Sequence, residues 1–204
     1  MRVSLLSALF FLTAAACAQT MVEERYPSGQ LRAIGEMLDG QKSGKWEYYY
    51  PSGELNAVEH FIKNRLHGEV IYYYRSGQTE GIEQWMYGVL LDSAFYYHEN
   101  GTLYRYGIYT NGMYDGLWKY YFDNNNPDRQ VRYKSGMLTG EMLQYNREGI
   151  LVQQGFYQDG KEHGEWKFFD DQGRLSFSGF YDYGERVGVW FQYDQKGRKK
   201  KWKY

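Results

Sequence analysis

The feature that most constrains this chain is a repeat of 24 residues. From Tyr26 to Tyr193 the sequence divides without gaps into seven blocks of this length, and a partial eighth block occupies 194–204. A unit this short cannot bury a hydrophobic core by itself, so such chains fold by stacking each repeat on its neighbours. The period therefore predicts one elongated array over residues 26–193, with no linker and no second domain.

Three positions in every block carry residues typical of turns. Glycine stands at positions 4, 15 and 19, and the exceptions are Asn125, Asn64 and Asp92. Asn and Asp tolerate a left-handed backbone better than other non-glycine residues, so these positions are predicted to have positive φ. The stretches between them, about five to eight residues long and rich in Tyr, Trp, Phe and Val, are typical of strands. The sequence therefore predicts an all-β fold, an elongated antiparallel repeat sheet of seven consecutive 24-residue β-hairpins.

Glycine and tryptophan occur together at two further positions. Four blocks have glycine at position 10 and tryptophan at position 21, and the other three have neither. A hairpin turn centred between positions 15 and 16 would place these positions opposite each other, with each indole across the bare backbone of its glycine. The same register would place the aromatic residue of position 12 opposite the glycine of position 19. The predicted structural pairs are Gly35 with Trp46, Gly107 with Trp118, Gly155 with Trp166, and Gly179 with Trp190.

Position 24 is aromatic in all seven blocks. Strand alternation turns these rings away from positions 21 and 23, so both faces of the sheet are expected to carry aromatic side chains. They could form a stacking platform for glycan rings or peptide, or a packed ladder opposite position 6 of the next block, which is often Leu. We favour the packed ladder. The residues are Tyr49, Tyr73, Tyr97, Tyr121, Tyr145, Phe169 and Tyr193.

The N-terminal residues 1–18 have the order of a secretory signal peptide, with a positive charge at Arg2, an apolar stretch over 3–12 and then small residues. The apolar stretch is too short for a permanent membrane helix. Two processing outcomes stay open, because ACA at 16–18 fits a cleavage site whereas AAAC ending at Cys17 resembles a lipobox. The protein is therefore expected to be exported, and to be periplasmic, outer-membrane-associated or extracellular. A lipid on Cys17, the one cysteine of the chain, would attach it to a membrane.

The candidate catalytic groups do not assemble into a motif. Two of the four histidines occupy the same turn position four blocks apart, where strands about 4.8 Å apart would hold them far from each other. No zinc-protease, serine-hydrolase, phosphate-binding or dinucleotide-binding pattern occurs. A net charge of −1 does not favour nucleic acid as a partner. We therefore expect a non-catalytic protein with no cofactor, no metal site and no nucleic-acid partner. The histidines are His60, His67, His98 and His163.

The segment RKKKWKY at 198–204 is the one strong charge run of the chain. Such a run could attract an anionic membrane surface. It could instead protect the edge of the sheet, because lysines on a terminal strand discourage another sheet from pairing there. We favour edge protection.

The string GFYQDGKEHGEWKFFDDQG at 155–173 resembles the MORN repeat, in which glycines and aromatic residues alternate with Asn/Asp-Gly turns. The tryptophan before a doubled aromatic is similar to the bacterial MORN-variant repeat of YwqK-type antitoxins. The resemblance recurs from Tyr26 to Tyr193 and is weakest in blocks three and five. It implies an elongated sheet of hairpins used for binding or scaffolding. The antitoxin name implies a cytoplasmic toxin as partner, and the signal peptide argues against that role.

These features together predict a repeat scaffold that binds another protein outside the cytoplasm. A long sheet offers an extended surface and little concave pocket, which favours protein–protein interaction. A cell-surface glycan-binding protein and a toxin-neutralising, antitoxin-like protein remain as alternatives. Exposure of the position-24 aromatics would separate the first two, and a neighbouring toxin gene would support the third.

Overall fold

The computed structural model describes residues 19–202, which form strands and turns. The predicted signal peptide with Cys17 lies outside these residues, as do positions 203 and 204 of the basic segment. No helix that could cross a membrane occurs between Gln19 and Trp202. The strands are β1 (Gln19–Arg25), β2 (Leu31–Leu38), β3 (Gln41–Tyr49), β4 (Leu55–Ile62), β5 (Arg65–Leu66), β6 (Gly68–Tyr73), β7 (Thr79–Met86), β8 (Val89–Leu90), β9 (Asp92–Tyr97), β10 (Leu103–Thr110), β11 (Met113–Tyr121), β12 (Pro127–Lys134), β13 (Met137–Tyr145), β14 (Leu151–Gln158), β15 (Lys161–Phe169), β16 (Leu175–Asp182), β17 (Glu185–Tyr193) and β18 (Lys199–Trp202).

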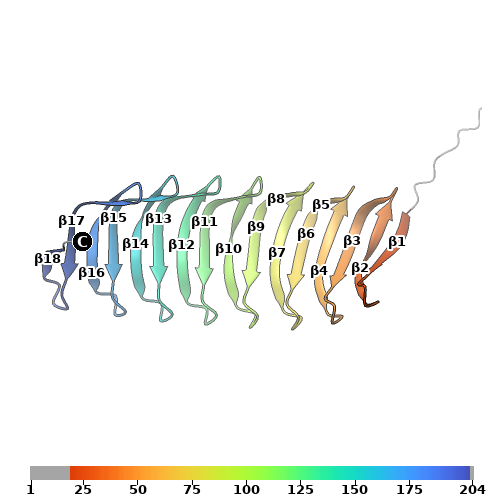
Figure 1. Cartoon of the computed structure of the whole chain (residues 1–204), viewed down its shortest axis with the longest axis horizontal. Coiled ribbons are helices and arrows are strands. Elements are labelled where there is room, and N and C mark those ends of the chain that lie inside the picture. Colours follow the sequence, from red (N-terminus) through yellow and green to blue (C-terminus); the bar gives the residue numbers. More distant parts are fainter. Residues whose placement is uncertain (1–18, 203–204) are drawn as a thin grey trace, which may run out of the picture.

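All of these strands belong to one antiparallel sheet in which each strand pairs with its neighbours in the sequence (Figure 1). The prediction of an elongated all-β hairpin array is confirmed. The second strands of blocks two and three are each broken in two, at His67 and Leu91. Because every contact is between neighbouring hairpins, β1 and β18 lie at opposite ends of the molecule (Figure 1).

The array starts earlier than the sequence analysis placed it. β1 precedes Tyr26 and pairs with β2, with Val22 opposite Gly35 and Arg25 opposite Leu31. These are the pairings that the second strand of each of the first six blocks makes with the first strand of the next, as in Tyr49 opposite Leu55. β1 therefore corresponds to the second strand of a repeat, which the block boundaries chosen from the sequence left out.

The hairpin turns lie one residue before their predicted centre. Asp39 and Gly40, at positions 14 and 15, have φ values of 50° and 74°, the signs of a type I′ turn. Leu38 pairs with Gln41 across this turn, so its centre is between positions 14 and 15 and not between 15 and 16. The predicted positive φ at positions 4, 15 and 19 is confirmed, including at Asn64, Asn125 and Asp92.

A bulge in the second strand corrects the register that this turn alone would set. Glu36 pairs with Ser43, but the next pair is Gly35 with Trp46, so Gly44 and one further residue are extra on β3. Gly44 has a φ of 63°, which an L side chain rarely adopts and glycine adopts without cost. The glycine of position 19 is therefore a bulge residue. It shifts the strand by two residues and keeps the tryptophan on the same face.

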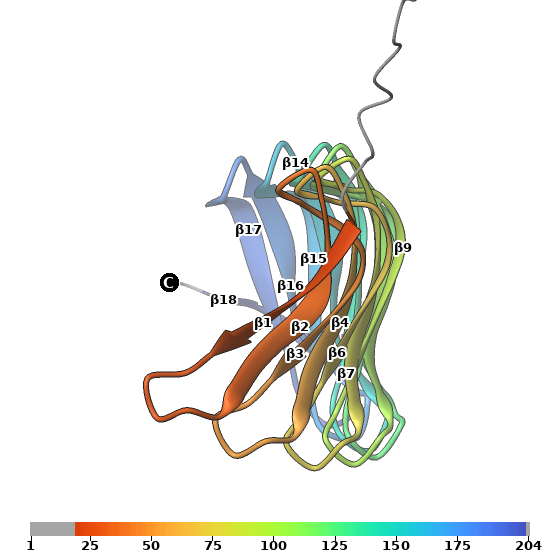
Figure 2. The same ribbon diagram turned by 90° about the vertical axis from the view of Figure 1, so that its right-hand side faces the viewer.

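The strands bow, which gives the sheet one concave and one convex face (Figure 2). The side chains of positions 8, 10, 12, 17, 21 and 23 share one face, here called the inner face, and all of the fully buried residues belong to it. A single-layer sheet encloses large side chains only where they pack over one another on one side. The buried apolar residues are Ala33, Trp46, Ala57, Val58, Val70, Ala94, Tyr109, Trp118, Tyr120, Val131, Met142, Trp166 and Trp190, with Val58 the one member outside the inner-face positions.

Candidate binding surfaces

The four predicted glycine–tryptophan pairs lie together on the inner face. A Cβ atom built on Gly155 would lie 2.1 Å from Cδ2 of Trp166, well inside van der Waals contact. The corresponding closest distances are 2.3 Å for Gly35 to Trp46, 2.2 Å for Gly107 to Trp118 and 2.1 Å for Gly179 to Trp190. Each indole therefore lies flat on the bare backbone of the glycine in its own hairpin, and no other residue fits beneath it.

In three of the four hairpins the indole N–H completes the backbone hydrogen bonding at the bulge, whereas Nε1 of Trp190 is buried without a partner. Nε1 of Trp46 donates to the carbonyl of Glu36 over 2.9 Å, and Nε1 of Trp118 donates to the carbonyl of Ile108 over 3.1 Å. These carbonyls belong to position 11, directly before the ladder is interrupted. Because a buried carbonyl without a partner is costly, the tryptophan both covers the glycine and satisfies the group that the bulge leaves unpaired.

Aromatic and cationic side chains pack against the indoles. Trp118 is in edge-to-face contact with Tyr109 and Tyr114, with ring centroids 5.1 and 4.5 Å away. Trp46 is covered instead by a cation–π contact, in which Nζ of Lys42 lies 3.9 Å from the ring centroid. These contacts leave Trp118 and Trp46 with no exposed surface. The tryptophans therefore form the core of the hairpins and are not accessible to a ligand.

One predicted register is wrong. The aromatic residue of position 12 does not face the glycine of position 19 in its own hairpin, because Met37 pairs with Lys42. Gly44 is instead opposite Phe61, the position-12 residue of the next block. Because the bulge falls at position 19, the glycine there has no partner within its own hairpin. The aromatic residue of position 12 therefore lies opposite the glycine of the preceding hairpin, and this pairing connects successive hairpins.

A buried carboxylate organises the middle of the inner face. Glu83 is 8% exposed and stands at position 10, where other blocks have glycine. It accepts hydrogen bonds from Tyr96 Oη at 2.6 Å, Trp85 Nε1 at 3.0 Å and Tyr72 Oη at 3.2 Å. Three donors compensate for the burial of the charge. The network joins two successive hairpins through side chains alone.

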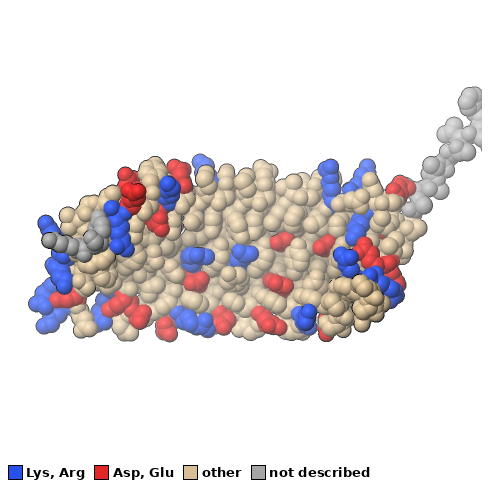
Figure 3. Space-filling model, in the orientation of Figure 1, with Lys and Arg blue, Asp and Glu red and all other residues tan. Residues whose placement is uncertain are grey.

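Arginines take the place of the acidic residues farther along the same face. The guanidinium carbon of Arg105 lies 4.2 Å from the ring centroid of Tyr96, and Nη1 of Arg105 donates to Tyr114 Oη over 3.0 Å. Arg129 lies over Tyr120 at 4.4 Å. In Figure 3 both acidic and basic side chains lie along the middle of the visible face. The tyrosines of this face thus make two kinds of contact. Their hydroxyl groups donate hydrogen bonds to a carboxylate, and their ring faces contact arginine guanidinium groups.

Burial of these tyrosines predicts a loss of stability in alkali. Burial is the largest cause that raises the pKa values of Tyr72, Tyr96 and Tyr120, and it raises the pKa of Tyr109 to about 12. Below pH 10 the phenols are neutral in both the folded and the unfolded chain. Between about pH 10 and 12 the unfolded chain ionises first, so the free energy of unfolding should fall over this range. Denaturant unfolding at several pH values, with phenolate absorbance as a second readout, measures the effect. A constant free energy of unfolding from pH 9 to 12 would contradict it.

The position-24 aromatics form the packed ladder that the sequence analysis favoured. Tyr49 is opposite Leu55, Tyr97 opposite Leu103 and Phe169 opposite Leu175, each in the next block. All seven rings are half-buried. The rings therefore do not form a fully exposed row on which successive sugar rings could stack.

The outer face carries exposed apolar side chains at its C-terminal end. Phe156 on β14, Phe180 on β16, and Val187 and Val189 on β17 are 50%, 52%, 37% and 45% exposed, and we call them the outer apolar patch. Phe180 is directly opposite Val187 across the strand pair. The position of the two phenylalanines, position 11, is Glu36, His60 and Gln84 in the first three blocks. The fold therefore does not require an apolar residue there.

His67 and His163 belong to different hairpins, as the repeat spacing predicts, whereas His67 lies opposite His60 in its own hairpin, where its backbone N–H donates to the carbonyl of His60 over 2.8 Å. His60 Nδ1 lies 2.9 Å from the carbonyl oxygen of Glu69, and His98 Nε2 lies 2.9 Å from that of Tyr121. His67 packs on Tyr87 in the second block, whereas His163 belongs to the sixth block on β15. Within residues 19–202 no cluster of three or more His, Cys, Asp or Glu side chains could hold a metal ion.

The residue at position 1 has a role that the sequence analysis missed. Oη of Tyr26 donates to the carbonyl of Tyr49 over 2.8 Å, and Tyr50 and Tyr74 repeat this bond one and two blocks later. In later blocks Asp170 accepts from the backbone N–H groups of its own turn, chiefly that of Arg174, which holds the pKa of Asp170 below its usual range. The signal was the run of tyrosines at position 1 in the first three blocks.

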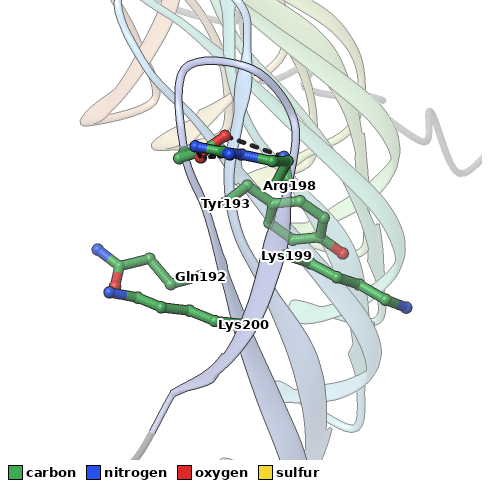
Figure 4. A pocket seen from close by; sticks show the side chains of 6 residues that line it. Gln192, Tyr193, Arg198, Lys199 and Lys200 are labelled. Atoms are coloured by element: carbon green, nitrogen blue, oxygen red, sulfur yellow. Dashed lines mark hydrogen bonds and ion pairs between the residues drawn. The ribbon is translucent and has the colours of Figure 1, made fainter.

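A shallow pocket lies beside the last turn (Figure 4). Arg198 forms an ion pair with Asp194 at 2.7 Å across this turn, and Lys200 extends beside Gln192. The pocket is lined by Gln192, Tyr193, Asp194, Arg198, Lys199 and Lys200. It is bounded on one side by β18, the terminal strand of the sheet.

Comparison with protein families finds the MORN repeat variant four times along the chain. The chain belongs to the MORN-repeat family. Each match covers the second strand of one hairpin and the first strand of the next, so the family's unit is set half a period from the blocks used above. The string at 155–173 overlaps the last match only at 155–159. The matched residues are 42–63, 66–85, 114–135 and 138–159.

Comparison with curated proteins and with solved structures adds little. No curated protein matches the chain. A GtfA/B complex bound to UDP and GlcNAc is similar over 54% of this chain and 22% of its own, at 14% identity and a TM-score of 0.25. TcdB2-TccC3 without its hypervariable C-terminal region is similar over 90% of this chain and 10% of its own, at 12% identity and a TM-score of 0.25. The Photorhabdus luminescens Tc holotoxin pore is similar over 89% of this chain and 12% of its own, at 14% identity and a TM-score of 0.25. The chain thus spans less than a quarter of these structures' lengths, and scores at this level say nothing about function.

Proposed function

We propose that this MORN-repeat scaffold is a non-catalytic, exported protein that binds another protein through the outer apolar patch. The scaffold itself follows from the fold, since a single-layer sheet of hairpins presents two long surfaces. The observation that supports a protein partner is the exposure of Phe156 and Phe180, each half exposed on a strand of the sheet. Contiguous exposed apolar residues with polar surroundings are typical of protein-binding surfaces, and aromatic residues dominate their binding energy.

The polar neighbours of the patch fit the same proposal. Glu141 on β13 lies opposite Phe156 at one side of the patch, and Glu165 lies opposite Phe180 on β15, the strand between the two phenylalanine strands. Protein–protein interfaces commonly combine apolar contacts with charged and hydrogen-bonding groups. A partner with an apolar surface and basic residues around it would complement this arrangement.

Substitution of the two phenylalanines should weaken partner binding without unfolding the protein. The double variant Phe156→Ser and Phe180→Ser removes both exposed rings, and we expect at least a roughly tenfold loss of affinity, as for interface anchors. Partner capture from the extracytoplasmic fraction, with quantification of the captured proteins, measures it. The matched control is His60→Ser with Gln84→Ser, which changes the same position in the second and third blocks. Equal capture by the wild type and both variants would exclude the patch as the binding surface.

Export rests on the sequence of residues 1–18, and Cys17 offers a direct test. If Cys17 is lipidated, Cys17→Ser should move the protein from the membrane fraction to the soluble exported fraction. Fractionation followed by immunoblotting measures the change. A wild-type protein that is already soluble and exported would reject lipid attachment and leave simple secretion, whereas a cytoplasmic protein would reject export.

The two alternative functions have less support. Glycan binding through position 24 would need exposed rings, and these rings are half-buried against the next hairpin. A toxin-neutralising role would need a neighbouring toxin gene and a cytoplasmic location, and the signal peptide argues against the location.

A further inference from the structure

The two terminal strands of the sheet each have one edge without a neighbour in the described part of the chain. β1 pairs only with β2, and β18 pairs only with β17. An unpaired strand edge presents a row of backbone N–H and C=O groups that can accept another strand. Because the two edges lie at opposite ends of the elongated sheet, they cannot meet within one molecule (Figure 1).

The two edge strands are complementary halves of the repeat. β1 corresponds to positions 18–24, the second strand of a hairpin, and β18 starts at position 6, where first strands start. In every complete block these two kinds of strand pair with each other, as β2 does with β3. β18 therefore lacks the partner that β1 represents, and β1 lacks the partner that β18 represents.

The charges of the two edges are opposite. β18 carries Lys199, Lys200 and Lys201, all exposed, whereas β1 carries Glu23 and Glu24. Figure 3 shows basic side chains gathered at the end of the molecule that carries β18. Two copies of β18 would bring lysines together, and two copies of β1 would bring glutamates together. The lysines therefore protect β18 against other basic or neutral edges, as edge protection requires, whereas the acidic edge of β1 is the one edge that they favour.

The faces of the strands set a specific register. Trp202 is opposite Trp190 and packs on it, so Trp202 and Lys200 belong to the inner face and Lys201 to the outer face. On β1, Val22 is opposite Gly35, which places Val22 and Glu24 on the inner face and Glu23 on the outer face. An antiparallel pair that keeps both inner faces on one side brings Lys200 to Glu24, Lys201 to Glu23 and Trp202 to Val22. Lys199 and Arg25 then fall at the end of the ladder, where internal hairpins such as β2–β3 form no pair.

We infer that this chain assembles head to tail with further copies of itself, β18 of one copy pairing with β1 of the next. The new strand pair completes a hairpin and continues the repeat from one molecule into the other. Glu23 already forms an ion pair with Arg25 at 2.6 Å and Glu24 with Lys42 at 3.3 Å, but exposed pairs of this kind are weak and exchange readily. A contact between unlike surfaces does not close on itself by two-fold symmetry, so it builds rows of molecules or a ring.

Charge reversal tests the contact in both directions. The protein, purified as its host processes it, should have a concentration-dependent mass above that of one chain at low salt, measured by light scattering after size exclusion. Glu23→Lys with Glu24→Lys makes both edges basic, and Lys200→Glu with Lys201→Glu makes both acidic, so each variant alone should be monomeric. An equimolar mixture of the two variants should recover the larger mass, because each basic edge meets an acidic one. Recovery also shows that both variants are folded. A wild type that stays monomeric, or variants that associate as the wild type does, would overturn the inference.

Zero-length cross-linking locates the contact on native residues. A carbodiimide should join Lys201 to Glu23 or Lys200 to Glu24, and peptide mass spectrometry identifies the product. Because these residues lie at opposite ends of one molecule, such a link forms only between copies and its yield should rise with protein concentration (Figure 1). The pair Lys45–Glu47, 2.7 Å apart within one chain, is the control whose yield should not change with concentration. Links between like edges, or none between β1 and β18, would reject this register. Neither experiment uses the outer apolar patch, so its outcome is independent of the proposed function.

Discussion

Replacing Gly155 by Val is expected to lower the free energy of unfolding by about 3 kcal/mol, the upper end of the usual cost of overpacking. β-propensity alone would predict a slight gain, because Val is a far better strand former than Gly. The loss is expected because a Cβ atom would lie 2.1 Å from Trp166, whose ring is 1% exposed and held by Tyr157 and Tyr181. The ring must therefore move out of the core to admit the new side chain. Denaturant unfolding of the variant measures the loss.

A double-mutant cycle shows whether the loss comes from the ring. Trp166→Met combined with Gly155→Val imitates block five, where Val131 and Met142 occupy these positions. The double variant should recover part of the loss, and the coupling energy is the deciding quantity. Gln154→Val is the control, since it introduces the same residue on the same strand at a position that faces away from the indole. Additive effects of the two substitutions would mean that the glycine and the tryptophan are not structural partners.

Deletion of one whole block, Asn146–Phe169, should leave a folded protein, whereas deletion of half a block should not. The whole-block deletion removes β14 and β15 and joins Tyr145 to Asp170, a position 24 followed by a position 1 as at every block boundary. Met142 then faces Gly179 in place of Gly155, so each pairing rule is kept. In a repeat array the loss of one unit costs only its own stability and one interface.

Deletion of residues 158–169 alone removes β15 and the turn before it. The remaining first strand β14 is then followed by another first strand, β16, and the hairpins beyond this point are out of phase with those before it. Trp190 could no longer join the inner face of the preceding hairpins. We expect loss of the cooperative unfolding transition, measured by circular dichroism in denaturant. Equal damage from the two deletions would contradict a fold built from independent hairpin units.

The sequence by itself determined the features that depend on neighbouring residues. Positive φ at position 15 was predictable because only Gly and Asn occur there, and the backbone conformation at Asn64 has this sign. The contact of Gly155 with Trp166 was predictable because both residues recur together in the same four blocks. The first signal occurs in all seven blocks and the second in four of them, so a local preference is visible without any second sequence.

The tertiary structure decided what depends on how strands meet. The bulge at Gly44 moves the pairing of large with small residues from one hairpin to the next, and no single block shows which of the two strands will bulge. β1 became part of the sheet because its edge groups find partners on β2, although half a repeat gives little periodic signal. The buried carboxylate of Glu83 acquires its three donors from β6, β7 and β9, and only the paired strands bring them together. Turn preferences act over a few residues along the chain, whereas burial and edge pairing are set by neighbours across the sheet, and for that reason they appeared only in the folded molecule.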